Sequence, residues 1–211
     1  MVIYCLLTSV FAATLMSGFT RVIQDKKMPG DHDPLRDNWG VKWRAFFKHM
    51  DMNGDGKMDE NEYVNMTAAT VGTITKSAEK EEKMRAFLKE NWERWWKSFM
   101  KDASFGISAD DFISTEPKTR EKMVDIQHLV MEVKWALMLF ELVDVDVNDS
   151  LNETEYGNYL EIFRAPFSPD IFYEADSNSD GSIDKSEMVI NELSWTISKS
   201  TDGADFYGKV L

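Results

Sequence analysis

The chain has 211 residues, of which 43% are hydrophobic and 12% aromatic, and its net charge is −13. This composition predicts a folded protein with one compact domain or two closely packed lobes, and it excludes a disordered chain. The excess of carboxylates argues against a nucleic-acid partner, because phosphate contacts need clustered Lys and Arg. A single cysteine, Cys5, excludes an internal disulfide and makes a thiolate zinc site improbable.

The first 20 residues contain an uncharged, largely apolar run at 2–19, near the minimum length for a membrane span. A cleaved signal peptide normally has a Lys or Arg before its apolar run, and none precedes this one, which argues against cleavage. If residues 1–20 form a signal anchor, the basic residues after them would stay cytoplasmic and leave the remaining chain in the cytosol. An extra packing helix is the alternative, and a secreted protein is less favoured. Residues 21–35 are expected to form a linker.

Two segments match the EF-hand calcium loop, in which oxygens at positions 1, 3, 5, 7, 9 and 12 bind the ion and position 6 is Gly. They are residues 51–62 and 176–187. The predicted ligands of the first loop are Asp51, Asn53, Asp55, the carbonyl of Lys57, Asp59 and Glu62. Those of the last loop are Asp176, Asn178, Asp180, the carbonyl of Ser182, Asp184 and Glu187.

A third loop at residues 144–155 follows the same pattern, except that Asp149 replaces the turn glycine. Its predicted ligands are Asp144, Asp146, Asn148, the carbonyl of Ser150, Asn152 and Glu155. Asp tolerates a positive φ better than most residues. Because calcium affinity follows ligand charge and rigidity, this site is expected to bind more weakly than the other two.

Two glycosylation motifs lie inside this third loop. They begin at Asn148 and Asn152, which are predicted calcium ligands. A glycan on either residue would block the loop, so the pattern argues against the secretory lumen.

A fourth hand is expected because EF-hands pair, and residues 100–111 supply a degenerate loop. Ile107 occupies the apolar position 8, but Met100 stands in the place of the first Asp, Phe105 replaces the turn glycine and Asp111 replaces the bidentate Glu. This loop is predicted to be metal-free and to complete the first pair structurally.

The predicted fold is therefore an all-α protein with four EF-hands in two paired lobes, joined by short β-bridges between paired loops. One pair covers residues 36–114 and the other residues 115–211. Helical spacing of Trp43, Phe46 and Met50 before the first loop supports an entering helix there.

Functional hands one, three and four with a degenerate second hand resemble the sarcoplasmic calcium-binding proteins, the calexcitins and the calcium-regulated photoproteins of coelenterates. The resemblance covers residues from about 36 to 211, and the tail at 203–211 resembles the terminal segment that closes the core in that family.

The photoprotein branch would imply a coelenterazine oxygenase or a binder of a similar apolar ligand. The residues that resemble its pocket aromatics are Trp135, Tyr159, Trp195 and Tyr207. Both pocket histidines are replaced, by Trp43 and Asn191, so luminescence is not favoured.

The favoured function is an intracellular calcium buffer or signal-shaping protein that binds three Ca²⁺, with Mg²⁺ as the expected competitor. A calcium sensor that exposes a groove to a partner helix is the alternative, for which some of the 13 Met residues could supply adaptable contacts. Membrane contact is expected only through residues 2–19. No phosphate-cradling glycine loop or activated nucleophile appears, so the chain is expected not to be an enzyme.

Overall fold

The computed structural model describes residues 38–100, 106–116, 118–123 and 125–197. The predictions made for residues 1–20, for the linker at 21–35, for Phe105 and for the tail at 203–211 lie outside these ranges. In the part of the chain that is described, no helix is both long and apolar enough to cross a membrane.

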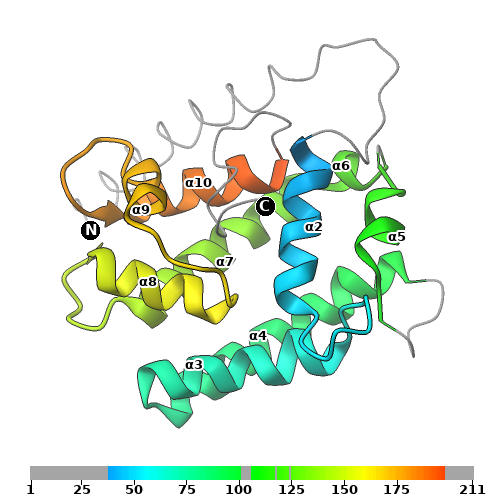
Figure 1. Cartoon of the computed structure of the whole chain (residues 1–211), viewed down its shortest axis with the longest axis horizontal. Coiled ribbons are helices and arrows are strands. Elements are labelled where there is room, and N and C mark those ends of the chain that lie inside the picture. Colours follow the sequence, from blue (N-terminus) through cyan, green and yellow to red (C-terminus); the bar gives the residue numbers. More distant parts are fainter. Residues whose placement is uncertain (1–37, 101–105, 117, 124, 198–211) are drawn as a thin grey trace.

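Helices flank each of the four predicted loops (Figure 1). The first half of the chain contains α2 (Asn38–Met50), a π-helical turn (Asn61–Met66), α3 (Thr67–Thr75), α4 (Ala78–Arg94), a 3₁₀ turn (Trp96–Phe99) and α5 (Ala109–Ile113). The second half contains α6 (Lys118–Met123), α7 (Ile126–Val143), β1 (Ser150–Leu151), α8 (Glu153–Ile162), α9 (Pro169–Ala175), β2 (Ile183–Asp184) and α10 (Lys185–Ile197). The predicted all-α EF-hand fold is confirmed.

The loops are joined in pairs through the apolar residue at position 8 of each. Met58 and Ile107 form an antiparallel bridge with N–O distances of 2.9 and 3.0 Å. In the second pair, Leu151 lies opposite Ile183 in the two-stranded ladder. All four side chains are buried, so the same residues hold the loops together and anchor them in the core.

Short polar side chains fix where several helices begin. Ser77 accepts a hydrogen bond from the Lys80 amide at the start of α4, and Asp125 accepts one from the Gln127 amide at the start of α7. At α8, Asn152 caps the first turn while Glu155 bonds back to the Asn152 amide. These caps satisfy amides that have no partner within the helix.

A single aromatic core spans both pairs of hands. The ring of Trp43 on α2 lies 4.7 Å from that of Phe112 on α5 and 4.8 Å from that of Trp195 on α10. The indole of Trp39 donates a 3.0 Å hydrogen bond to the carbonyl of Thr196. Burial of such large rings stabilises a fold strongly, so the two pairs are packed together rather than tethered.

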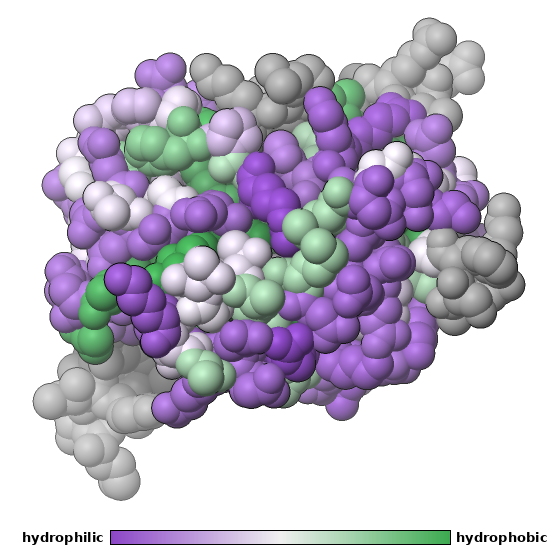
Figure 2. Space-filling view, turned by 60° about the horizontal axis from the view of Figure 1, so that its bottom comes forward, coloured by the Kyte–Doolittle hydropathy of each residue, from purple (hydrophilic) through white to green (hydrophobic). Residues whose placement is uncertain are grey.

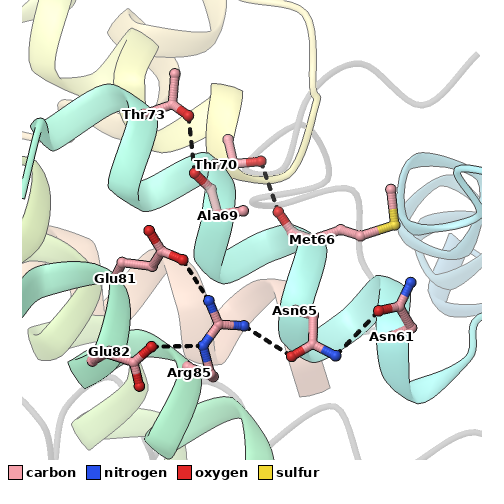
Figure 3. A network of polar contacts seen from close by, with 9 residues as sticks. All are labelled: Asn61, Asn65, Met66, Ala69, Thr70, Thr73, Glu81, Glu82 and Arg85. Atoms are coloured by element: carbon pink, nitrogen blue, oxygen red, sulfur yellow. Dashed lines mark hydrogen bonds and ion pairs between the residues drawn. The ribbon is translucent and has the colours of Figure 1, made fainter. Parts of the chain in front are cut away.

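The π-helical turn at Asn61–Met66 and α4 of the first pair are further joined by the polar network in Figure 3. Arg85 on α4 donates to the Asn65 side chain at 2.8 Å and pairs with Glu81 and Glu82 on its own helix. Asn65 in turn donates to Asn61 at 3.1 Å. The network links the helix that leaves the first loop to the helix that enters the second.

Gly106 marks a close approach between the paired loops. Its φ is +71°, and a Cβ added there would lie 2.8 Å from the Met58 carbonyl oxygen. Gly106→Ala is expected to destabilise the protein by about 2–4 kcal/mol, from left-handed backbone strain plus this backbone clash. Denaturant unfolding of the calcium-loaded protein measures the change.

Gly54→Ala is the matched control for this substitution. Its φ of +73° is nearly the same, but no atom lies within 4 Å of the added Cβ. Gly54→Ala should therefore cost only the strain, about 1–2 kcal/mol. Equal losses in the two variants would show that the close approach to Met58 contributes nothing.

Candidate metal centres

The first loop, residues 51–62, is organised by the carboxylates at its two ends. The Asp51 carboxylate accepts hydrogen bonds from the amides of Gly54 and Gly56, both at 2.8 Å. One oxygen of Glu62 accepts from the Met52 amide at 2.8 Å, and the other accepts from the Asp59 amide at 3.0 Å. Glu62 is therefore folded back over the loop, although it belongs to the helix that follows.

The last loop, residues 176–187, has the same arrangement. Asp176 accepts from the Gly181 amide at 2.8 Å, while the two oxygens of Glu187 accept from the amides of Asn178 and Asp184, each at 3.0 Å. The turn glycines adopt left-handed φ values, +85° at Gly56 and +89° at Gly181. Glycine adopts such φ values without steric cost, which explains why both loops have Gly at position 6.

The intermediate ligand positions form short local turns. At position 3, Asn53 and Asn178 each accept a 2.8 Å bond from the amide two residues later. At position 5, Asp55 and Asp180 do the same at 3.0 Å. Hydrogen bonds from Ser182 lower the pKa of the Asp180 carboxyl, which favours the charged form that a cation needs.

The residues at positions 7 and 9 flank the bridging residue of each loop. The position 7 residues, Lys57, Ser150 and Ser182, directly precede it. The position 9 side chains each accept a bond of 2.8–3.1 Å from the amide of the Glu at position 12, and they are Asp59, Asn152 and Asp184. Position 9 therefore also caps the helix that leaves the loop.

The third loop, residues 144–155, brings together carboxylate oxygens of Asp144, Asp146 and Glu155 within 4.8 Å of one another. Asp149 has the positive φ that its position requires, +63°, and its carboxylate pairs with Lys185 of the neighbouring loop. Val147 is also left-handed, with φ +57°. This β-branched residue is strained there, and weaker binding by this loop stays a prediction.

The degenerate hand uses its last acidic residue differently. Asp111 is exposed; its carboxylate accepts a 2.8 Å bond from the Ser108 hydroxyl, and its amide donates to the same hydroxyl at 3.1 Å. By contrast, Glu62, Glu155 and Glu187 are only 2–5% exposed. In the described part of this hand, Ser108 therefore caps α5, and Asp111 lies exposed at the position where the other three loops have a buried glutamate.

A partly open pocket of about 30 Å³ lies where the helices of the two pairs meet. Its lining includes Trp43, Tyr63, Trp96, Trp135 and Trp195 together with the polar residues Asn91, Glu132 and Glu192. The volume suffices for one or two waters. Trp43 Nε1 and Asn91 Oδ1 are buried without a hydrogen-bond partner among the described residues, so such waters would have groups to bind.

The predicted pocket aromatics are divided by the structure. Trp135 and Trp195 line the pocket, Tyr159 is buried but is not part of the described lining, and Tyr207 lies outside the described residues. Of the two residues that replace the histidines, Trp43 joins the lining and Asn191 donates to the Ala175 carbonyl at 2.8 Å. Sequence spacing did not identify the two glutamates on α7 and α10 that join the lining. Isolated acidic residues on apolar helices carry no local signal that marks them as internal.

Two segments of the chain match a family model described as EF hand, at residues 44–67 and 170–189. These segments contain the whole of the first and last loops. No curated protein matches the chain.

Several solved structures share the fold. A calcium-loaded coelenterazine-binding protein from Renilla muelleri is 20% identical, with a TM-score of 0.60 over 85% of this chain and 99% of that one. A sarcoplasmic calcium-binding protein from amphioxus is 18% identical, with a TM-score of 0.63 over 82% and 98%. Calcium-loaded apo-aequorin from Aequorea victoria is 16% identical, with a TM-score of 0.62 over 76% and 91%. The predicted resemblance is confirmed at the level of the fold.

Proposed function

Since this chain carries EF-hands, which are calcium-binding motifs, we propose that it is a calcium buffer or signal-shaping protein that takes up three Ca²⁺. The proposal rests on the position 12 glutamates. Both oxygens of Glu62, Glu155 and Glu187 accept backbone amides of their own loops, so each loop is closed around its acidic residue. Buffer EF-hands need little opening when they bind calcium.

The shared core supports the same role. Opening a hand would separate α2 from α10 and expose the rings of Trp43 and Trp195, which lie 4.8 Å apart. On the face in Figure 2 hydrophilic residues predominate, although hydrophobic residues are exposed in several places. A fold that keeps its aromatic rings buried both with and without calcium can exchange the ion without exposing a new apolar surface.

A calcium sensor is the second candidate, favoured by a groove of about 470 Å³ between α4 and α7. Two apolar residues on its α7 side are exposed, Ile126 by 67% and Val130 by 47%. A groove with exposed apolar residues is the feature that a partner helix needs. Its lining also carries charges of both signs, from Glu90, Arg94 and Lys134.

A coelenterazine-type ligand is not part of the proposal. Ligand sites of that class usually measure about 300–1,000 Å³, whereas the pocket lined by the predicted aromatics Trp135 and Trp195 measures about 30 Å³. We further propose a cytosolic protein with no catalytic activity, in which Mg²⁺ competes for the same loops. The glycosylation motifs at the predicted ligands Asn148 and Asn152 support a location outside the secretory lumen.

Calorimetric calcium titration of the full chain, with an apolar-surface dye in a parallel sample, tests the proposal. Three Ca²⁺ are expected to bind while dye fluorescence stays constant. Dye fluorescence that rises as calcium fills the sites would favour the sensor. Two bound Ca²⁺ would contradict the assignment of the loop at residues 144–155.

A further inference from the structure

The turn of the third loop is made by a residue other than glycine. Asp149 stands at position 6 with φ +63°, where Gly56 and Gly181 have +85° and +89° in the first and last loops. Its amide donates to the Asp144 carboxylate at 3.1 Å, as the amides of the two glycines do to the first Asp of their own loops. The loop therefore needs this left-handed backbone in order to close, and the conformation costs Asp more than Gly.

A lysine of the fourth loop contacts this turn. Ser150 lies opposite Asp184 in the antiparallel ladder, which places Asp149 and Lys185 opposite each other one step beyond it. The Lys185 ammonium pairs with the Asp149 carboxylate, and it also lies 5.5 Å from the ring centroid of Phe140 near the end of α7. Lys185 thus joins the turn of the third loop to the helix that enters this loop.

The ion pair lies beside the predicted metal ligands and includes none of them. Asp149 is at position 6 of its loop and Lys185 at position 10, and neither position supplies a ligand. In the first loop the position 10 residue, Glu60, pairs with Lys89 on α4. Gly56, at the turn of that loop, has no side chain that could make such a contact. The pair can therefore be altered without removing a ligand oxygen.

We propose that Lys185 is a positioning residue for the third calcium site, because it holds Asp149 in the left-handed turn and so preforms the loop at residues 144–155. The inference rests on the proposed function, since it requires that this loop binds Ca²⁺. An Asp without a partner has other backbone conformations available, and ordering the loop during binding then reduces the affinity. Rigidity and ligand charge together set the calcium affinity of an EF-hand. The fourth loop therefore compensates for the glycine that the third loop lacks.

Positioning and a simple charge effect predict changes of opposite sign when Lys185 is neutralised. Removal of a cation near a Ca²⁺ site tightens binding, because the two positive charges no longer repel each other. Removal of a residue that preforms the loop weakens binding. The direction of the change in calcium affinity therefore separates the two explanations.

The experiment measures the calcium affinity of the third loop alone, in a full-length Glu62→Gln/Glu187→Gln background. Lys185→Met, which removes the charge and keeps an apolar stem beside Phe140, is expected to weaken binding about two- to fivefold, the range for an exposed ion pair. Lys185→Arg should restore the affinity to within about twofold of the background protein. With Asp149→Gly also present, Lys185→Met should no longer weaken binding, because Gly adopts the turn without a partner.

Each outcome has a separate meaning. Failure of the background protein to bind calcium would refute the proposed role of the third loop, independently of Lys185. Unchanged or tighter binding by Lys185→Met would overturn the proposal, and so would equal weakening with and without Asp149→Gly, since Lys185 would then act without Asp149. If Lys185→Met does not fold in chelator, Lys185→Gln carries the same expectations.

Discussion

Removal of calcium is expected to lower the melting temperature of the protein by about 15–30 °C, the largest effect that the structure predicts. A ligand at 100 times its dissociation constant stabilises a fold by about 2.7 kcal/mol per site, so three sites contribute about 8 kcal/mol. In a domain of this size each kcal/mol shifts the melting temperature by about 2–4 °C. Calcium binding should affect stability through the buried carboxylates of Glu62, Glu155 and Glu187, because no cation compensates their charge when the loops are empty.

Circular dichroism melts in excess Ca²⁺ and in chelator measure this difference. Melts in NaCl at matched ionic strength are the control, since general screening of the net charge of −13 also stabilises the fold. A shift of the same size with NaCl alone would show that screening, and not occupation of the loops, stabilises the protein.

Glu62→Gln is expected to weaken calcium binding at the first loop on the order of 100-fold, because affinity follows the number of charged ligands. The substitution keeps the shape of the side chain and one oxygen acceptor, but it removes the negative charge. Glu187→Gln should act in the same way at the last loop, which has the same hydrogen bonds around its glutamate. In calorimetry, each variant is expected to lose one Ca²⁺ at micromolar protein concentration.

Asp111→Asn provides the matched control, since Asp111 holds the same position in the degenerate hand. The Asp111 carboxylate is exposed and bonds to Ser108, so its neutralisation should leave both the number of calcium ions and their affinities unchanged. Loss of a bound calcium in Asp111→Asn would show that the second hand also binds metal. Full binding by Glu62→Gln would refute the first loop as a site.

The local features of this protein could be predicted from its sequence. A calcium loop is specified within twelve consecutive residues, so oxygen donors, a turn residue and an apolar bridging residue identify it without knowledge of the rest of the chain. Pairing of Met58 with Ile107 followed from the apolar residue at position 8, although the second loop has lost most of its ligands. The all-α fold followed from these loops and from the helical spacing of the apolar residues around them.

Other features were decided only by tertiary structure. Val147 in a left-handed conformation and the glutamates that line the pocket between the two pairs have no signature in local spacing. The pocket lining depends on how the second pair of hands packs against the first, which joins residues far apart in the chain. Sequence determined which loops can bind a cation, because the ligands of one ion lie within twelve consecutive residues. Packing decided which distant residues line one pocket, because contact depends on distance in space and not on spacing along the chain.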